Sequence, residues 1–330
     1  MKENDIRPKH LQEEFLRLSK EDINEFFNVA GDRVHSSCPA CDEPKKFKRQ
    51  FVKNGFVYVE CPKCGTLFAD PRPSEAAIDR YYKGSKAAQY WAEHLFKETE
   101  EARRKAIFSP KAKMVVNLLK EYSGQGKIEN IVDVGMGYGI FGEEIRKLGY
   151  FNEIFGIEPS PFLAGVCRGK GFDVIEKPVE EVTGVGGAFE AATSFEVIEH
   201  LFSPEKFLIA INKILAGDGY LILTTLNIYG FELLSLWEKS GSIFPPHHIN
   251  FFNLASLEML LERTGYKVLK GFTPGKLDVD IVKNNIDRVQ QNRFTRYLVE
   301  KAPGKAREGF QLFLQENNLS SHMCIIAQKV

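Results

Sequence analysis

The chain has 330 residues, and its 44 basic residues balance its 44 acidic residues, so the formal net charge is zero. This balance argues against a general binder of nucleic acids or of membrane surfaces. No apolar run approaches the roughly 20 residues of a membrane-spanning helix, and the N-terminal residues lack the apolar stretch of a secretory signal. We therefore expect a cytoplasmic protein with one large domain and a smaller one.

Residues 1–36 are polar, with apolar residues at roughly helical spacing, which predicts an N-terminal helical segment. Ser19 is followed three residues later by Asp22, a pattern close to a capping box. We therefore expect two short helices, with Ser19 capping the second one.

Two Cys-x-x-Cys pairs come next in the chain, and their members are Cys38, Cys41, Cys61 and Cys64. Each pair forms a tight turn that aims two thiolates at one point, and two such turns complete the tetrahedron that zinc prefers. Between the pairs, residues 47–60 alternate around Asn54-Gly55, which predicts a β-hairpin. We expect a zinc ribbon over residues 37–73, and its Zn²⁺ should be structural because four thiolates leave no open position. Disulfides or idle thiols are the alternatives, and they fit poorly in a chain without an export signal.

A glycine-rich turn at residues 131–142, reading I-V-D-V-G-M-G-Y-G-I-F-G, organises the rest of the chain. A buried parallel strand is expected before it and a helix after it. The glycines that allow the backbone to approach a ligand closely are Gly135, Gly137 and Gly139. Asp133 precedes them and suits a ligand that presents an ammonium and a sulfonium, such as S-adenosylmethionine, whereas it would repel a pyrophosphate. Gly137, Gly139 and Gly142 also satisfy the dinucleotide pattern G-x-G-x-x-G, so a nicotinamide cofactor stays open on the glycines alone.

Strands and helices alternate regularly over residues 74–330. After the first strand, further strands are expected at residues 151–157, 172–175, 188–195, 220–226, 266–272 and 322–330, with a helical insertion at residues 274–320. This alternation predicts an α/β fold with a doubly wound, seven-stranded, mostly parallel sheet.

Acidic and imidazole side chains follow the second and fourth predicted strands, at the end where a doubly wound sheet binds its ligand. Glu158 comes 19 residues after Gly139, and it is placed to accept hydrogen bonds from the ribose hydroxyls of an adenosine. The residues past the fourth strand are Glu196, Glu199 and His200.

The connection at residues 227–253 is long and rich in aromatic residues. It contains His247 and His248, which we interpret as part of a substrate-facing wall, with a purely structural role as the alternative. Zinc binding by these two histidines is not expected, because no nearby Cys or carboxylate completes a ligand set.

Over roughly residues 109–272, these motifs resemble those of class I S-adenosylmethionine-dependent methyltransferases, which have a Rossmann-like fold. The zinc ribbon ahead of them, with the histidine pair, is similar to a bacterial group that includes sugar C-methyltransferases. The resemblance implies that Asp133 binds the methionyl ammonium, that the three glycines approach the cofactor and that Glu158 holds the ribose. The other cofactor-binding residues that it implies are Pro159, Val179, Phe195 and Glu196, with Val179 and Phe195 beside the adenine.

By this resemblance, the reaction is an in-line transfer of the methyl group to a small-molecule acceptor, for instance a sugar or a cell-surface polysaccharide precursor. The candidate bases are Glu199, His200, His247 and His248, and Tyr229 is expected to orient the substrate. Neither a membrane nor a nucleic acid is expected as a partner. Two alternatives stay open: a nicotinamide-dependent oxidoreductase, and a zinc-ribbon binding protein with a non-catalytic S-adenosylmethionine-binding domain.

Overall fold

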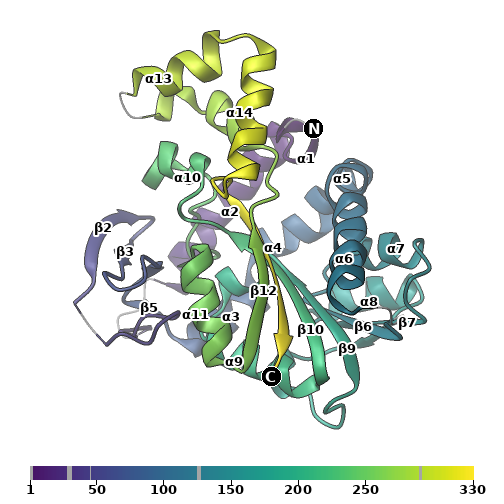
Figure 1. Cartoon of the computed structure of the whole chain (residues 1–330). Coiled ribbons are helices and arrows are strands. Elements are labelled where there is room, and N and C mark those ends of the chain that lie inside the picture. The colour runs from purple at the N-terminus through teal and green to yellow at the C-terminus, as the bar shows by residue number, and fades with distance from the viewer. Residues whose placement is uncertain (1–2, 28–31, 45, 125–127, 290–291) are drawn as a thin grey trace.

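The computed structural model describes residues 3–27, 32–44, 46–124, 128–289 and 292–330. Figure 1 shows a twisted central sheet with helices on both faces, a smaller sheet to one side and a helical extension at the top. The central sheet has the strand order β12-β13-β10-β9-β6-β7-β8. Its strands are β6 (Asn130–Val134), β7 (Glu153–Ile157), β8 (Asp173–Ile175), β9 (Phe189–Phe195), β10 (Leu215–Leu226), β12 (Tyr266–Phe272) and β13 (His322–Lys329).

The predicted doubly wound, mostly parallel fold is confirmed. Strands β8, β7, β6, β9 and β10 pair in parallel, whereas β13 runs antiparallel to both β10 and β12. The chain runs outward from β6 through β7 and β8, and then returns to β9 on the other side of β6. This reversal opens a crevice at the carboxyl end of β6, which is where such sheets bind ligands.

The central strands are apolar on both faces because helices cover both sides of the sheet. Val132 and Val134 of β6 pack in one hydrophobic core and Ile131 in the other. The helices flanking the sheet are α6 (Ser109–Tyr122), α7 (Ile140–Arg146), α8 (Pro161–Gly169), α9 (Pro204–Ile214) and α11 (Leu254–Arg263). Figure 1 places α6 and α7 on one side of the sheet and α9 and α11 on the other.

The ribbon forms a second, antiparallel sheet in the order β11-β4-β3-β2. Its strands are β2 (Lys48–Lys53), β3 (Phe56–Glu60), β4 (Leu67–Ala69) and β11 (Asn250–Phe251), and nearby β1 (Arg33–Val34) pairs with β5 (Arg72–Pro73). The predicted hairpin is present, and Asn54 and Gly55 turn it with φ values of 49° and 77°. Because β11 comes from the long connection after β10, the fourth strand of the ribbon sheet belongs to the larger part of the chain. The division at residue 73 therefore stays a prediction.

The N-terminal segment contains α1 (Glu3–Ile6) and one long helix, α2 (Lys9–Phe26). The predicted break at Ser19 is wrong: Ser19 lies inside α2, and its hydroxyl donates to the Phe15 carbonyl at 2.7 Å. The helical arm that follows the ribbon leads into α6, and it consists of α3 (Glu75–Gly84), α4 (Lys86–Tyr90), η1 (Trp91–Leu95), α5 (Phe96–Arg103) and η2 (Arg104–Phe108).

The insertion before the last strand is helical, as the sequence predicts. It comprises α12 (Asp278–Asn284), η6 (Ile286–Arg288), α13 (Arg293–Arg296), η7 (Tyr297–Lys301) and α14 (Gly304–Glu316). With α10 (Phe231–Leu236), it packs around a small core of its own that includes Leu236, Val282 and Leu314. The remaining short helices are η3 (Val179–Glu181), η4 (Ile198–His200) and η5 (Trp237–Lys239).

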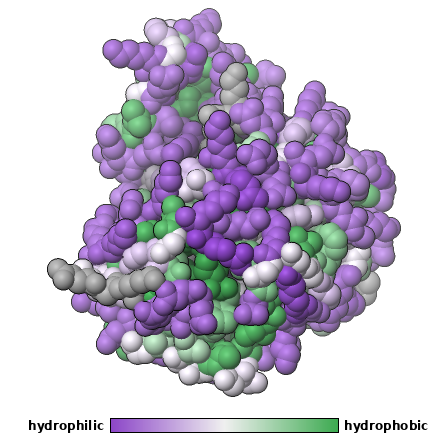
Figure 2. Space-filling view, turned by 90° about the vertical axis from the view of Figure 1, so that its right-hand side faces the viewer, coloured by the Kyte–Doolittle hydropathy of each residue, from purple (hydrophilic) through white to green (hydrophobic). Residues whose placement is uncertain are grey.

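The face in Figure 2 is mainly hydrophilic, with hydrophobic residues gathered toward its lower centre. Among the described residues, no helix combines the length and the apolar character needed to cross a bilayer.

Candidate active site and metal centre

One cavity of about 2570 Å³ opens at the carboxyl ends of β6, β7 and β9. Its walls include the glycine turn and the strand-end acids on one side, and the histidine loop on another. A typical small-molecule pocket measures ~300–1,000 Å³, so the cavity has room for a cofactor together with a second molecule. Of the predicted catalytic and cofactor-binding residues, all but Gly139 and Tyr229 line it.

The glycine turn needs its glycines for different reasons. Gly135, Gly137 and Gly139 have φ values of 81°, 56° and 69°, a region that side chains disfavour. A methyl group on Gly135 would meet Val197 Cγ2 at 2.6 Å, whereas one on Gly137 would meet no protein atom within 4 Å. Gly139 is the N-cap of α7. Gly137 therefore borders open space in the cavity, whereas Gly135 lies closely packed against Val197.

Glu158 is tied to the glycine turn by its own side chain. The Gly137 N–H donates to Oε2 at 2.8 Å, and the Ser160 N–H donates to Oε1 at 3.0 Å. Burial raises the pKa of Glu158, while these two backbone donors oppose the rise. The carboxylate is thus fixed in orientation, and each oxygen keeps a lone pair for a further donor such as a hydroxyl.

Asp133 lies at the base of the cavity, and only 4% of its surface is exposed. The Thr193 hydroxyl donates to Asp133 Oδ1 at 2.8 Å. Burial raises the pKa of Asp133 to about 7, and the Thr193 hydrogen bond and the Lys111 charge only partly counter this rise. A cation bound beside Asp133 would favour its ionised form.

The apolar walls of this end of the cavity include the predicted pair Val179 and Phe195. Val179 is buried in η3, and the Phe195 ring packs edge-on against Phe141 at a centroid distance of 4.7 Å. Pro159 also lines the cavity, directly after Glu158. These side chains could contact the faces of a planar ring.

Glu196 has a non-glycine backbone in the left-handed region, with φ at 54°, directly after β9. The Thr224 hydroxyl donates to its carboxylate at 2.7 Å, Lys111 Nζ lies 3.8 Å away and His322 Nδ1 lies 3.4 Å away. Although burial opposes it, the charges of His322 and Lys111 lower the pKa of Glu196. Sequence reasoning missed both of these partners, because Lys111 lies in an ordinary helix and His322 at the start of the last strand.

Glu199, His200 and His248 come together at the far side of the cavity. Each offers a ligating atom, and these atoms lie within 4.8 Å of one another. Glu199 is buried and accepts a hydrogen bond from the Thr225 hydroxyl at 2.7 Å. Burial and the nearby Glu196 charge raise the pKa of Glu199, and burial lowers the pKa of His200, while that of His248 falls to about 3. The expectation that no nearby carboxylate joins the histidine pair is wrong, because Glu199 reaches His248 from a distant part of the sequence.

His247 and Tyr229 do not belong to the cluster of Glu199, His200 and His248. His247 Nε2 lies 2.6 Å from the Tyr81 hydroxyl, and its ring stacks on Phe244 at 5.6 Å. Burial lowers the pKa of His247 well below the ordinary value. Tyr229 is 44% exposed and its hydroxyl lies against Gly65 of the ribbon, so the structure does not bring it to the cavity.

The four ribbon cysteines converge on a single point. Cys38 Sγ lies 3.5 Å from Cys64 Sγ, Cys41 Sγ lies 3.6 Å from Cys61 Sγ, and all four sulfurs are within 4.8 Å of one another. Zn–S bonds of about 2.3 Å in a tetrahedron would put the sulfurs roughly 3.8 Å apart. All six cysteines of the chain are free thiols, so the disulfide alternative has no support in the structure.

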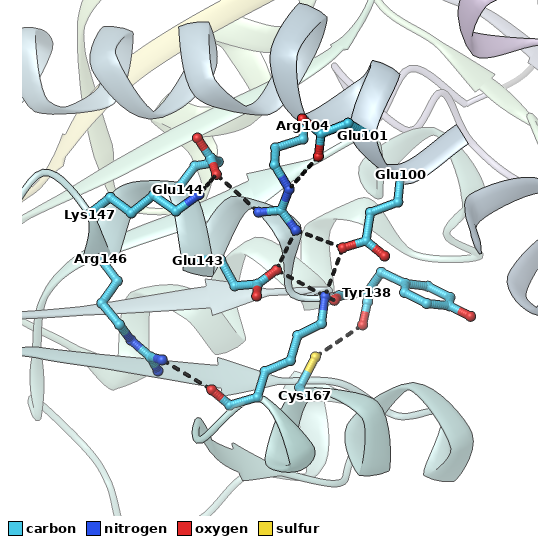
Figure 3. A network of polar contacts seen from close by, with 11 residues as sticks. Glu100, Glu101, Arg104, Tyr138, Glu143, Glu144, Arg146, Lys147 and Cys167 are labelled. Carbon is cyan, nitrogen blue, oxygen red and sulfur yellow. Dashed lines mark hydrogen bonds and ion pairs between the residues drawn. The ribbon is translucent and has the colours of Figure 1, made fainter. Parts of the chain in front are cut away.

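An ion-pair network holds the helical arm to the glycine turn. Figure 3 shows Arg104 of η2 pointing into a set of acidic side chains, and its Nη atoms lie 2.6 Å from Glu100, 2.8 Å from Glu143 and 3.0 Å from Glu144. Next to it, Tyr138 of the turn stacks on Phe96 of α5 at 5.6 Å. The arm is therefore attached to the helix that begins at the turn.

Comparison with known proteins agrees with this fold. A family model described as a methyltransferase domain matches residues 90–270. The ubiquinone biosynthesis O-methyltransferase of Cereibacter sphaeroides (strain ATCC 17025) is 26% identical over 127 residues, which is 34% of this chain and 51% of that protein. The mitochondrial enzyme of the same name from Bos taurus is 29% identical over 42% of this chain and 41% of that protein. The chain thus spans about half the length of the curated relatives it matches.

Two solved structures have similar folds. A SAM-dependent methyltransferase from Archaeoglobus fulgidus has a TM-score of 0.44 at 18% identity, covering 66% of this chain and 94% of that one. The phosphoethanolamine N-methyltransferase 2 of Haemonchus contortus, in complex with S-adenosyl-L-methionine, has a TM-score of 0.46 at 16% identity, covering 66% and 52%. The family match over residues 90–270 is what places the chain among known proteins.

Because the family model covers more than half of the chain, the protein belongs to the methyltransferase-domain family. The nicotinamide-dependent alternative is thereby set aside. The matched segment, residues 90–270, is a methyltransferase domain.

Proposed function

We propose that this methyltransferase modifies a small-molecule acceptor bound between the glycine turn and the histidine loop. The observation that carries the proposal is one continuous cavity with two chemically different ends. One end has the fixed carboxylates Asp133 and Glu158 beside open space at Gly137. The other end has Glu199, His200 and His248.

The first end suits S-adenosylmethionine, which supplies an activated methyl group when bound. Asp133 would bind its ammonium, Glu158 would accept from its ribose hydroxyls, and Val179 and Phe195 would cover the adenine. Gly137 supports this assignment, since an added methyl group there would meet only open space in the cavity. Pro159 and Glu196 line the same region.

The second end would position the acceptor and take up its proton. Burial lowers the pKa values of His200, His247 and His248, so these imidazoles are neutral near pH 7 and have lone pairs that can accept a proton. His247 is already hydrogen bonded to Tyr81, and this favours His200 and His248 for contact with the acceptor.

The four ribbon cysteines would hold a structural Zn²⁺. Four soft thiolate donors with near-tetrahedral spacing are the set that zinc prefers, and they leave no position for a substrate. Tyr58 of the ribbon donates to the His248 carbonyl at 2.6 Å, so the ribbon also supports the histidine loop.

Two acceptor classes are candidates, one from the sequence resemblance and one from the names of the curated relatives. The ribbon with the histidine loop is similar to a group with sugar acceptors, whereas the curated relatives are named for ubiquinone biosynthesis. A panel of nucleotide sugars and phenolic compounds, scored by formation of S-adenosylhomocysteine, separates the two classes.

Once an acceptor is found, His200→Ala, His247→Ala and His248→Ala should be compared at saturating cofactor. We expect turnover to fall at least ~100-fold in one of them, the range of a lost acid–base group. Unchanged turnover in all three would refute the role of the histidines. Cofactor binding without any turnover across the panel would favour the non-catalytic alternative.

A further inference from the structure

Three potential metal ligands converge outside the cysteine cluster. Glu199 and His200 belong to η4, which begins three residues after the end of β9, and His248 lies just before β11. The rings of His200 and His248 have centroids 4.8 Å apart, and the ligating atoms of all three residues lie within the same distance of one another. Ligands on one ion are typically separated by roughly 3–4 Å when metal–ligand bonds are ~2.1 Å, so small side-chain rotations would close the site.

The hydrogen bonds of the His200 and His248 rings leave the Nε2 atom of each ring free to bind a metal ion. His200 Nδ1 lies 3.0 Å from the His247 carbonyl, and His248 Nδ1 lies 2.6 Å from the Ser242 carbonyl. A carbonyl can only accept, so each Nδ1 carries the hydrogen and each Nε2 carries a lone pair. Metal-binding histidines almost always donate their second ring nitrogen to such a partner, which fixes the tautomer and the ring orientation.

Glu199 is a buried carboxyl group without a cationic partner. Its side chain is 1% exposed, and the Thr225 hydroxyl contacts one oxygen. In the part of the chain that the structure describes, no Lys, Arg or His lies within ion-pair distance of Glu199. A buried carboxylate without a cationic partner is costly, and a bound cation would remove that cost.

The backbone around the cluster is rigidly held. The Ile249 N–H donates to the Glu199 carbonyl at 2.9 Å, which joins the two segments that carry the ligands. The Asn250 amide donates to the Leu201 carbonyl at 2.8 Å, and the Tyr58 hydroxyl donates to the His248 carbonyl. The three side chains are thus presented by a fixed frame, as a preformed site requires.

We propose that Glu199, His200 and His248 bind a divalent transition-metal ion, separate from the ion of the four cysteines. Two imidazoles and a carboxylate suit Mn²⁺, Fe²⁺ or Zn²⁺, and three protein ligands leave open positions that face the cavity. In the methyl transfer, the ion would hold an oxygen of the acceptor. This role rests on the proposed function, whereas the binding of the ion does not. With the ion bound, His200 and His248 serve as its ligands in place of the base role considered above, and a metal-bound hydroxyl of the acceptor would lose its proton to solvent.

The test uses the full chain with one equivalent of Zn²⁺ to fill the thiolate site, followed by titration with Mn²⁺. Because Mn²⁺ favours oxygen and nitrogen donors over thiolates, loss of the free-ion paramagnetic resonance signal reports the second site. We expect one Mn²⁺ per chain, with an affinity at least ~10-fold weaker in His248→Gln and Glu199→Gln.

Two control variants should bind Mn²⁺ like the parent chain. His247→Gln changes the neighbouring imidazole but keeps the carbonyl that orients His200, and His35→Gln changes an exposed histidine next to Asp70. Calorimetry with S-adenosylmethionine checks that each variant is folded.

Absence of Mn²⁺ binding would overturn the proposal, and so would equal binding by the parent, His248→Gln and Glu199→Gln. Mn²⁺ binding that needs Glu199 and His248, in a chain that methylates nothing in the acceptor panel, would support the metal site while the proposed function fails.

Discussion

Replacing Gly137 by Ala isolates the role of the glycine turn in cofactor binding. Gly137 has φ at 56°, and the added methyl group would meet no protein atom within 4 Å. The cost to the fold is therefore the left-handed backbone alone, about 1–2 kcal/mol. Gly149 is the matched control, because it has φ at 61°, it also has no atom within 4 Å of an added methyl group, and it is exposed after α7.

Both variants should lose about 1–2 kcal/mol of unfolding free energy in chemical denaturation. Calorimetry with S-adenosylmethionine should separate them. We expect Gly137→Ala to bind at least ~10-fold more weakly, a loss of about 1.4 kcal/mol or more, and Gly149→Ala to bind like the parent chain. Parental affinity in Gly137→Ala would refute the placement of the cofactor over this glycine.

Variants at three further positions test other parts of the site. Because burial raises the pKa of Asp133 to about 7, cofactor affinity should weaken as the pH falls from about 8 to about 6, and an Asp133→Asn variant should lose this pH dependence in calorimetry. The raised pKa of Asp133 also affects the stability of the cofactor-free chain. Asp133 contributes most to the unfolding free energy below about pH 4, and this contribution is lost as the pH rises through about 7. In chemical denaturation, the unfolding free energy of Asp133→Asn should therefore lack this decline with pH. Tyr58→Phe removes the hydrogen bond to the His248 carbonyl; turnover should fall while cofactor affinity stays constant, and an equal fall in both would contradict the local role of the ribbon. Arg104→Met removes the cation that Glu100, Glu143 and Glu144 share (Figure 3), and leaves them only Lys170 and Lys147 as partners. Its unfolding free energy should drop by about 1–3 kcal/mol, whereas Lys147→Met, at a 62% exposed side chain, should change it by less than about 0.5 kcal/mol.

The central sheet was predictable because its signals are local. Ile131, Val132 and Val134 are apolar on both faces of one strand, and the glycines that follow permit the tight turn. The ribbon hairpin was equally predictable, since the two residues Asn54-Gly55 form its turn. The pattern of apolar residues and glycines over a few positions predicts these strands and turns, and tertiary contacts did not override the local preference.

Three of the missed features depend on contacts between distant segments. Glu199 reaches His248 only because the long connection after β10 folds back over η4. His322 meets Glu196 because the β10–β13 register pairs Leu226 with His322 at the same end of the sheet. The strand β11 has two residues, too few for any period, and its partner β4 lies far away in the sequence. Ser19 resembles a helix cap locally, yet α2 continues through it and buries its hydroxyl.

The shared ribbon sheet has a practical consequence for anyone who dissects this protein. A fragment beginning at residue 74 would leave β11 without β4, and the carbonyl of His248 without the hydroxyl that holds it. Such a fragment could still retain its nucleoside-binding half, because none of the residues assigned to the cofactor comes from the excised portion. Chelation of the Zn²⁺ proposed for the four cysteines should act in the same way, and it should weaken binding of the acceptor before it weakens binding of the cofactor.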